Sequence, residues 1–252
     1  MKSVKQQQRL SNILVYGALI LLCLIWTIPT FGTLVTSFRH RDDTNDSGWW
    51  TAFSDPNFTL SNYKQAISGR EVEIVGTDGE RQTVRGKDMS QAFINSLTVT
   101  IPSVIIPILV AAFAAYGFAW IDFPGRKFFF TAVIALMVVP LQIALVPILR
   151  DYKALNLNGT WLAIWLAHTG FGLTTSVYLL FNYINSLPRD ILESAFIDGA
   201  SHFTIFTRLI LPLSIPAIAS LAIFQFLWVW NDFLVATVFL GTRNEVMVLT
   251  QY

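Results

Sequence analysis

The sequence predicts an all-helical protein that crosses a membrane several times. Of its 252 residues, 54% are hydrophobic and only 13% are charged, whereas about a quarter of the residues in a soluble domain are charged. The mean hydropathy is +0.54. A helix needs about 20 apolar residues to cross a bilayer, and five stretches without Asp, Glu, Lys or Arg are long enough. These predicted spans are residues 10–38, 93–121, 128–149, 154–188 and 209–231.

The first segment, 10–38, is expected to stay in the mature protein. It is too long for a removable signal peptide and lacks a small-residue cleavage pattern. Together with the short tail before it, this segment forms the first predicted part of the chain, residues 1–38. A loop at 39–92 and a membrane core at 93–252 are the other two parts.

Basic residues in the short loops indicate the orientation. Lys2, Lys5 and Arg9 precede the first span, and further basic residues lie at 126–127 and at 189–208. If the helices alternate in direction, all three groups fall on one side, which the positive-inside rule makes the cytoplasm. The N-terminus is therefore expected in the cytoplasm. The loop 39–92 has seven basic and nine acidic residues and is expected outside.

The loop 39–92 carries two recognisable patterns. β-Favouring residues flank Gly76, Thr77, Asp78 and Gly79, which predicts a small β-hairpin. This hairpin is either a decoration of the loop or a contact for an external partner. An aromatic cluster at 49–53 precedes it and is typical of anchors at the membrane interface.

Prolines are frequent in the predicted spans. Seven of the ten prolines lie in or at the edges of these apolar segments. A proline inside a helix removes a backbone hydrogen bond, which a membrane tolerates where neighbouring protein or water satisfies the freed carbonyl. Kinked helices around a path through the membrane are expected. Small residues in 111–120 also predict a face on which another helix packs closely.

The connection at about 186–210 differs from the rest of the core because it combines carboxylates with a helix stop signal. Asp190 and Glu193 resemble a capping box, which predicts a helix of about two turns starting near Asp190. Gly199 fits the position just past the helix end, where a positive φ favours glycine. The polar face carries carboxylates instead of the Lys and Arg typical of a headgroup helix. This composition favours docking to a protein, although a surface helix in the headgroups remains the alternative.

Several classes of protein are disfavoured by what the sequence holds. It has no G-x-x-x-x-G-K-[ST] phosphate loop, so any ATP hydrolysis is expected in a partner. A net charge of +1 without a basic cluster gives no reason to expect nucleic-acid binding. The scattered His40, His168 and His202 supply no metal set, and no catalytic residue is assigned. The spans bury almost no charge, which disfavours an ion-coupled secondary transporter.

Polar and aromatic residues within the spans are candidates for a solute path. Gln142 and Gln225 are able to bond sugar hydroxyls, and Trp228 offers a stacking face. Asn231 and Asp232 follow at the outer end of the last segment, where the cost of burying an acid is smaller. Packing between helices explains all five residues equally well, so both interpretations stay open.

Several sequence motifs resemble those of a known protein family. The stretch from Glu193 to Ala200 reads E-S-A-x-x-D-G-A and is followed by Ile210-Leu211-Pro212. It resembles the EAA loop of binding-protein-dependent ABC importer permeases. Further motifs resemble the carbohydrate branch of that family, in the position of the maltose-type second permease subunit and closest to α-glucoside or related oligosaccharide permeases. They are Asn95-Ser96-Leu97, 115–119, 123–127, 187–190 and 230–233.

The resemblance implies a fold, a role and a set of partners. It implies a type I ABC importer permease in the inner membrane of a bacterium, importing a sugar or, as the alternative, a non-sugar solute. The partners would be a second homologous permease subunit, two ATPase subunits that use ATP and Mg, an external sugar-binding protein and membrane lipid. This chain would bind no cofactor itself. The residues implied to dock the ATPase are Glu193, Ala195, Phe196, Ile197, Asp198, Gly199, Ala200 and Phe203.

Two features depart from the family pattern. Ser194 stands where a second alanine is usual, a small exchange on a surface helix. The family also has a sixth spanning helix, whereas only a short apolar run, 246–249, precedes Tyr252. The resemblance therefore favours a truncated sequence.

Overall fold

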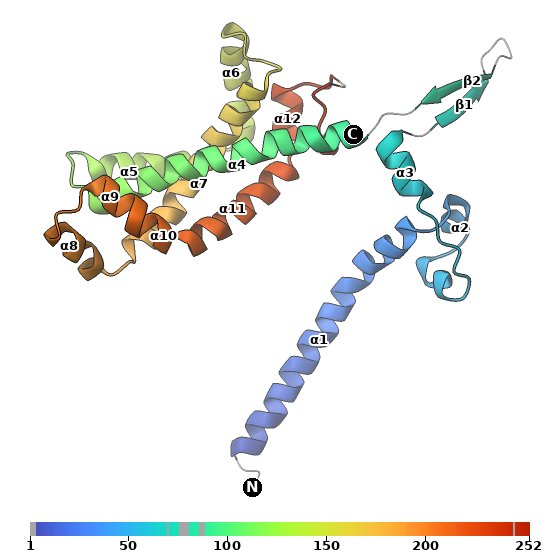
Figure 1. The fold of residues 1–252 in the computed structure, drawn as a ribbon, viewed down its shortest axis with the longest axis horizontal. Helices are drawn as coiled ribbons and strands as arrows, with labels where there is room; N and C mark the ends of the chain where they lie inside the picture. The colour runs from blue at the N-terminus through green and yellow to red at the C-terminus, as the bar shows by residue number, and fades with distance from the viewer. Residues whose placement is uncertain (1–3, 70, 76–80, 86–88, 244) are drawn as a thin grey trace. The chain divides into compact units, whose positions relative to one another are not determined.

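The computed structural model describes residues 4–69, 71–75, 81–85, 89–243 and 245–252. The chain divides into two compact units, Met1–Ser90 and Gln91–Tyr252. Both are predominantly helical (Figure 1). Among the described residues, three helices are long and apolar enough to cross a membrane, and up to five spans result if each of two bent helix pairs counts as one. The predicted all-α polytopic fold is confirmed.

The first unit consists of one long apolar helix followed by short elements. Helix α1 contains a candidate span, Asn12–Ser37. The buried Arg39 organises the turn after it by donating hydrogen bonds to the carbonyl oxygens of Asp43, Ser47 and Gly48 at 2.9 to 3.1 Å. The elements are α1 (Val4–Ser37), α2 (Arg41–Asp46), the 3₁₀ helix η1 (Trp49–Phe53), α3 (Ser61–Ser68), β1 (Glu71–Val75) and β2 (Arg81–Arg85).

The predicted β-hairpin is present. Strands β1 and β2 pair antiparallel, with Glu71 opposite Arg85 and Val75 opposite Arg81. The predicted turn residues Gly76, Thr77, Asp78 and Gly79 lie outside the described residues. The pairing follows from the β-favouring composition of the two flanks.

The aromatic cluster packs partly against α1. The Trp49 ring meets Phe31 edge to face at 5.8 Å, and a Cβ on Gly32 would lie only 2.7 Å from the Trp49 indole nitrogen. Gly32 is thus needed for this close approach. Trp50 and Phe53 are exposed, which suits the predicted interfacial anchors.

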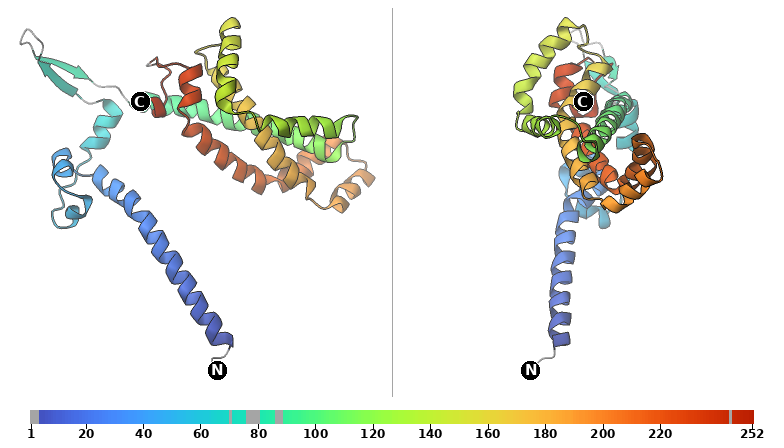
Figure 2. Two further views of the ribbon diagram at one scale, coloured as in Figure 1. Left: turned by 180° about the vertical axis from the view of Figure 1, so that it is seen from behind. Right: turned by 90° about the vertical axis from the view of Figure 1, so that its left-hand side faces the viewer.

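The second unit is a helical bundle with a core formed by α4, α7, α8 and the segment from α9 to α11 (Figure 2). Ala111 and Ala115 on α4 are fully buried in it, which confirms the predicted small-residue packing face. The helices are α4 (Met89–Trp120), α5 (Arg126–Leu136), α6 (Leu141–Ala154), α7 (Trp161–Asn185), α8 (Arg189–Ile197), α9 (His202–Ile205), the π-helix η2 (Phe206–Ile210), α10 (Leu211–Leu213), α11 (Ile215–Trp230), α12 (Leu234–Phe239) and the 3₁₀ helix η3 (Leu249–Gln251).

The predicted third span, 128–149, is wrong as a single helix. Helices α5 and α6 are bent by 100° at the break between them. Pro140 causes this break, because it has no N–H to continue the helix and restricts Val139 to extended conformations. The backbone at Pro140 is extended, with ψ 129°.

The other predicted spans differ from the structure at their boundaries. In the fourth predicted span, 154–188, the helix runs from Trp161 to Asn185, and Ala154 is the last residue of α6. The fifth is bent by 70° between Leu213 and Ile215, where Pro212 and Pro216 flank the buried Ser214. A proline in each flanking turn accounts for this bend.

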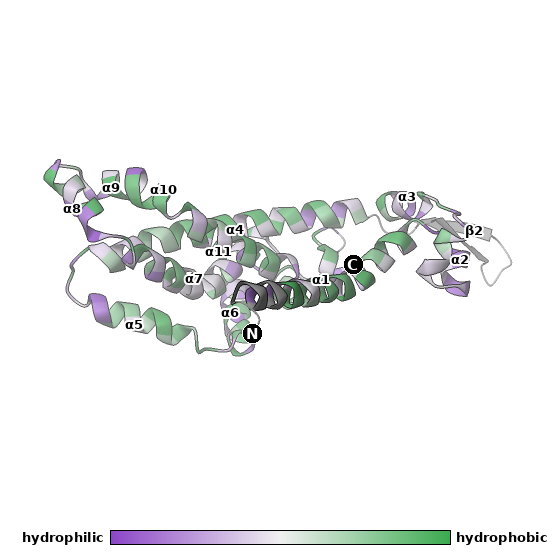
Figure 3. Ribbon diagram, turned by 90° about the horizontal axis from the view of Figure 1, so that it is seen from below, coloured by the Kyte–Doolittle hydropathy of each residue, from purple (hydrophilic) through white to green (hydrophobic). Residues whose placement is uncertain are grey.

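The bundle has two ends that carry different groups. At one end, the loop 121–125 and α8 line a common cavity; we call this the α8 end. At the other end, the Gly159 N–H donates to the Phe239 carbonyl at 2.7 Å, and the Gly159 carbonyl accepts a hydrogen bond from the Arg243 guanidinium at 2.8 Å. We call this the α12 end. Hydrophilic residues mark α8 and the start of α5, whereas hydrophobic residues extend along α4 and α11 (Figure 3).

Candidate functional site

Helix α8 begins one residue before the predicted start and without the predicted capping box. Its N-cap is Pro188, which has no side chain able to accept a hydrogen bond from the first turn. Asp190 lies in the first turn, where a carboxylate is favoured by the helix dipole. The predicted capping box is therefore wrong: Asp190 is the second residue of the helix, two positions after the N-cap that a capping box requires.

One side of α8 is attached to the bundle core. Leu192 is 1% exposed and belongs to the core cluster, and Ala195 packs against that cluster. Glu193 and Asp198 are exposed. The carboxylates predicted for the polar face are thus exposed, and Ile191 and Phe196, which neighbour the attached residues in the sequence, are exposed as well.

The exposed side of α8 also carries large apolar groups. Phe196 and Ile197 at the end of α8 are 39% and 86% exposed, and Phe203 on the following α9 is 68% exposed. Exposed apolar side chains next to carboxylates are typical of a protein contact surface. We call the residues Glu193, Phe196, Ile197, Asp198 and Phe203 the α8 surface.

Gly199 ends α8 in the predicted way. Its φ is +79°, a value that costs little only for glycine. The N–H of Gly199 donates to the Phe196 carbonyl and the N–H of Ala200 to the Ala195 carbonyl, both at 3.0 Å. This pair of bonds defines a Schellman motif. The sharp turn after α8 thus depends on the left-handed backbone at Gly199.

The chain returns to the core immediately after this turn. The Ser201 hydroxyl accepts the N–H of Thr204 at 3.3 Å and caps α9. Ile205, Phe206 and Ile210 are buried, and residues 206–210 form one π-helical turn. Such turns are rare and are frequently found at functional sites.

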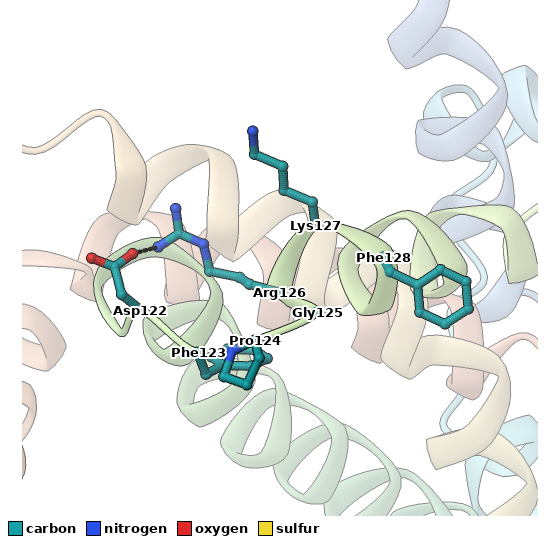
Figure 4. Close-up of a pocket in the computed structure, with 7 residues that line it drawn as sticks. All are labelled: Asp122, Phe123, Pro124, Gly125, Arg126, Lys127 and Phe128. Carbon is teal, nitrogen blue, oxygen red and sulfur yellow. Dashed lines mark hydrogen bonds and ion pairs between the residues drawn. The ribbon is translucent and has the colours of Figure 1, made fainter.

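The basic pair predicted to face the cytoplasm, Arg126 and Lys127, begins α5 directly after the loop 121–125. Gly125 has a φ of +82° and starts α5. The Arg126 guanidinium donates to the Asp122 carboxylate at 2.8 Å, as Figure 4 shows, while Lys127 points away from this ion pair. Arg126 also lines a cavity of about 380 Å³ together with Arg189 and Glu193 of α8.

The candidate path residues are not gathered in one place. Gln225 is 6% exposed and donates to the Ser103 carbonyl at 3.4 Å. Its amide fills the space over Gly172, where a Cβ would lie 2.5 Å from it. Gln142 is exposed, and the Asn231 amide bonds the Leu227 carbonyl of its own helix at 2.7 Å.

Trp228 does line a cavity. This cavity, of about 610 Å³, lies between α6, α7 and α11, and the polar residues of its wall include Asp151, Tyr152, Thr174 and Thr175. Tyr152 and Asp151 were not predicted as path residues. The sequence did not point to these two residues, because Arg150 precedes them and indicated that the predicted span had ended.

Asp232 organises the α12 end. Its carboxylate accepts the N–H groups of Val235 and Ala236 at 3.3 and 3.0 Å, so it caps the start of α12. Its carbonyl accepts the Thr250 hydroxyl at 2.6 Å. Asp232 lies beyond Trp230, where the candidate span ends. Burial raises the pKa of this carboxyl, and the backbone hydrogen bond from Ala236 acts in the opposite direction.

His168 is the other polar residue at this place. It is fully buried, and neither ring nitrogen has a hydrogen-bond partner among the described residues. Its Nε2 lies 3.8 Å from the nearer Asp232 oxygen, and its ring meets Trp228 edge to face at 5.3 Å. The described part of the chain holds no group of three or more metal-ligating His, Cys, Asp or Glu.

Replacing Asp232 with alanine is expected to destabilise the α12 end, because two N–H groups of α12 lose their acceptor. The expected cost is about 1 kcal/mol, seen as faster hydrogen exchange at Val235 and Ala236. Asp232→Asn retains an acceptor oxygen and serves as the control. Exchange in Asp232→Ala that equals that of the unaltered chain would show that the carboxylate does not cap α12.

The fold and the residues together define a class, the helical permease subunits of membrane transport systems. The family described as binding-protein-dependent transport system inner membrane component matches residues 90–250. The chain belongs to this family.

Two relatives and one solved structure extend this comparison. The chain is 48% identical over 240 residues to the osmoprotective compounds uptake permease protein GgtD of Synechocystis sp., covering 94% of this chain and 75% of GgtD. It is 41% identical, over an alignment of 319 positions, to the alpha-glucoside transport system permease protein AglG of Rhizobium meliloti. The alignment covers 94% of this chain and 83% of AglG. A crystal structure of a bacterial ABC transporter involved in alginate import matches with a TM-score of 0.64, at 17% identity, covering 99% of this chain and 80% of that one. The predicted ABC importer permease fold is confirmed.

Proposed function

We propose that this chain is the transmembrane permease subunit of an ATP-driven importer for a sugar, an α-glucoside or another di- or oligosaccharide. The match to the permease family over residues 90–250 is the observation that carries this proposal. The chain would form half of the translocation path. A second homologous permease subunit would form the other half, and an external sugar-binding protein would deliver the solute.

In this proposal the α8 surface docks on a cytoplasmic ATPase subunit. Glu193 and Asp198 supply charge, Ile197 and Phe203 supply exposed apolar area, and the attachment of Leu192 and Ala195 to the core fixes the helix. Ala200 continues the segment by closing the Schellman motif. ATP and Mg would act in two ATPase subunits, and their closure would move α8 and switch the path between its outward and inward states.

The proposed orientation follows from the same assignment. If α8 faces the ATPase, the α8 end of the bundle lies in the cytoplasm of a bacterium and the α12 end lies outside. The basic pair Arg126 and Lys127 then lies on the cytoplasmic side, as the positive-inside rule favours. Alternating spans would place the N-terminus in the cytoplasm and the loop 39–92 outside.

The path residues remain proposals. Trp228 is supported because it lines the cavity of about 610 Å³ and an indole face suits the apolar face of a sugar ring. Asp232 would act nearby, through the α12 end that it caps. Gln142, which is exposed, suits a contact at the boundary with the second permease. For Gln225 and Asn231, the bonds to protein carbonyls support a packing role unless the helices rearrange during transport.

Two solute classes are supported by relatives. The name of AglG supports an α-glucoside, and the name of GgtD supports an osmoprotective compound. Both classes include neutral polar molecules, which suit a cavity with hydroxyl and indole groups. An ion-coupled secondary transporter is the weaker alternative.

The test combines purification and uptake. The tagged chain, purified in mild detergent from its native membranes, is expected to retain a second permease and an ATPase. Uptake is then measured with radiolabelled trehalose, maltose, sucrose and glycine betaine. ATP-dependent uptake of one of the three sugars would support the proposal. Uptake of glycine betaine alone would contradict the proposal that the solute is a sugar. Uptake driven by an ion gradient without a bound ATPase would contradict the proposal of an ATP-driven importer.

A further inference from the structure

Besides the packing of Leu192, a second contact connects α8 to the rest of the bundle. The Phe196 ring meets the His202 ring edge to face at 5.0 Å. The Nδ1 atom of His202 is hydrogen-bonded to the Tyr116 hydroxyl at 2.9 Å. Tyr116 lies on α4, 86 residues earlier in the chain. The two contacts therefore join the α8 surface to α4 through His202.

The far end of this connection is firmly held. Tyr116 is buried, and its ring packs against Phe206 at 5.4 Å. Phe206 in turn stacks on Phe113, one turn earlier on α4, at 4.5 Å. A buried aromatic cluster of this kind is rigid because close-packed side chains have few alternative rotamers. A displacement of His202 is therefore transmitted to α4.

The covalent route from α8 into the bundle is more deformable. Beyond Phe206, whose ring belongs to the buried aromatic cluster, it continues through the rest of the π-helical turn and then through the 70° bend before α11. The Ser214 hydroxyl at that bend is buried without a hydrogen-bond partner among the described residues. An irregular segment of this kind absorbs movement instead of passing it on as a straight helix does.

We infer that Tyr116 and His202 are positioning residues for coupling, and that their hydrogen bond carries the position of α8 to α4 past this irregular segment. The inference rests on the proposed function, because it assumes that an ATPase moves α8. In this role neither residue needs to contact the solute or ATP, because the hydrogen bond acts between α9 and α4. Phe196 has two roles here, since its ring contacts His202 and the residue also belongs to the α8 surface.

The test uses variants that remove the hydrogen bond and keep the rings. Tyr116→Phe and His202→Phe are each expected to raise the ATP hydrolysed per solute imported by about three- to tenfold, the effect of losing one hydrogen bond. The double variant is expected to be no worse than either single one, because both remove the same bond. His202→Asn keeps a polar atom near the Nδ1 position but loses the ring contact with Phe196, so it is expected to stay uncoupled.

A matched control is available in the neighbouring helix. The Tyr183 hydroxyl donates to the Leu213 carbonyl at 3.0 Å, so Tyr183→Phe also loses one tertiary hydrogen bond but leaves α8 attached to α4. It is expected to keep the normal ratio of ATP to solute. An equal rise in Tyr183→Phe, or additive effects of the two single variants, would overturn the inference.

The measurement separates this inference from the proposed function. Complexes are reconstituted in liposomes, and ATP hydrolysis and uptake are measured with whichever of the four radiolabelled probes the unaltered complex carries. Loss of the ATPase from the unaltered chain would refute the proposed function. An ATPase that stays bound to every variant, with an unchanged ratio in Tyr116→Phe, would refute the positioning role alone.

Discussion

Replacing Gly199 with valine is expected to leave the chain in the membrane and to reduce solute uptake about tenfold. A Cβ on Gly199 would meet no atom within 4 Å, so the substitution causes no clash. It forces a β-branched residue to a φ of +79°, which costs about 1–2 kcal/mol or more. The Schellman motif is then depopulated, and the α8 surface is no longer presented in one position. Uptake and membrane content are measured together.

Gly241 offers a matched control for this prediction. Its φ is +78°, and a Cβ there would also meet nothing within 4 Å. Gly241→Val therefore introduces the same backbone strain at the α12 end. Gly199→Asn is a second control, because asparagine tolerates the left-handed conformation. If Gly199→Val transports normally, the assigned turn plays no part in coupling; if Gly241→Val is equally impaired, strain anywhere in the chain suffices.

Changing Glu193 to lysine is expected to release the ATPase. Glu193 is exposed on α8, so the charge reversal leaves the core attachment through Leu192 intact. At an interface, a like charge set against the group that pairs with Glu193 costs several kcal/mol. The expected result is at least a tenfold loss of ATPase co-purified with the tagged chain, while the second permease stays bound.

Charge reversal elsewhere distinguishes docking from a general effect. Glu245 is also exposed but lies at the α12 end. Its backbone carbonyl accepts a hydrogen bond from the Asn95 side-chain amide, and this bond does not involve the Glu245 side chain. Glu245→Lys is expected to retain the ATPase. Unchanged retention in Glu193→Lys would place the docking contact on other residues of the chain.

The local features of the candidate site were predictable because short-range rules decide them. Hydrophobic length revealed the membrane helices. The glycine that follows a short amphipathic run predicted both the end of α8 and the positive φ of Gly199, since this conformation excludes most other residues. The β-hairpin followed from strand-favouring flanks in the same way. The functional role of α8 stays a prediction, since it depends on chains outside this structure.

Features that depend on tertiary contacts were missed or misplaced. The sequence pattern did not show that Pro140 breaks a span by 100° whereas Pro107 stays inside a buried helix, because neighbouring helices decide how much bending is tolerated. The contact of Tyr116 with His202 joins residues far apart in the chain and has no local signature. Gln225 looked like a solute ligand, and only the packing on Gly172 shows how enclosed its amide is.

The break between α5 and α6 has a consequence for the assembly and degradation of the newly made chain in the cell. Met137 and Val138 close the last turn of α5 with bonds to carbonyls three residues back, and Val138 and Val139 are exposed there. Irregular backbone at membrane depth is tolerated only next to protein or water. The second permease that we propose would cover such a surface during assembly. Abundance would then be set jointly by both genes' products, with the surplus chain removed by membrane quality control.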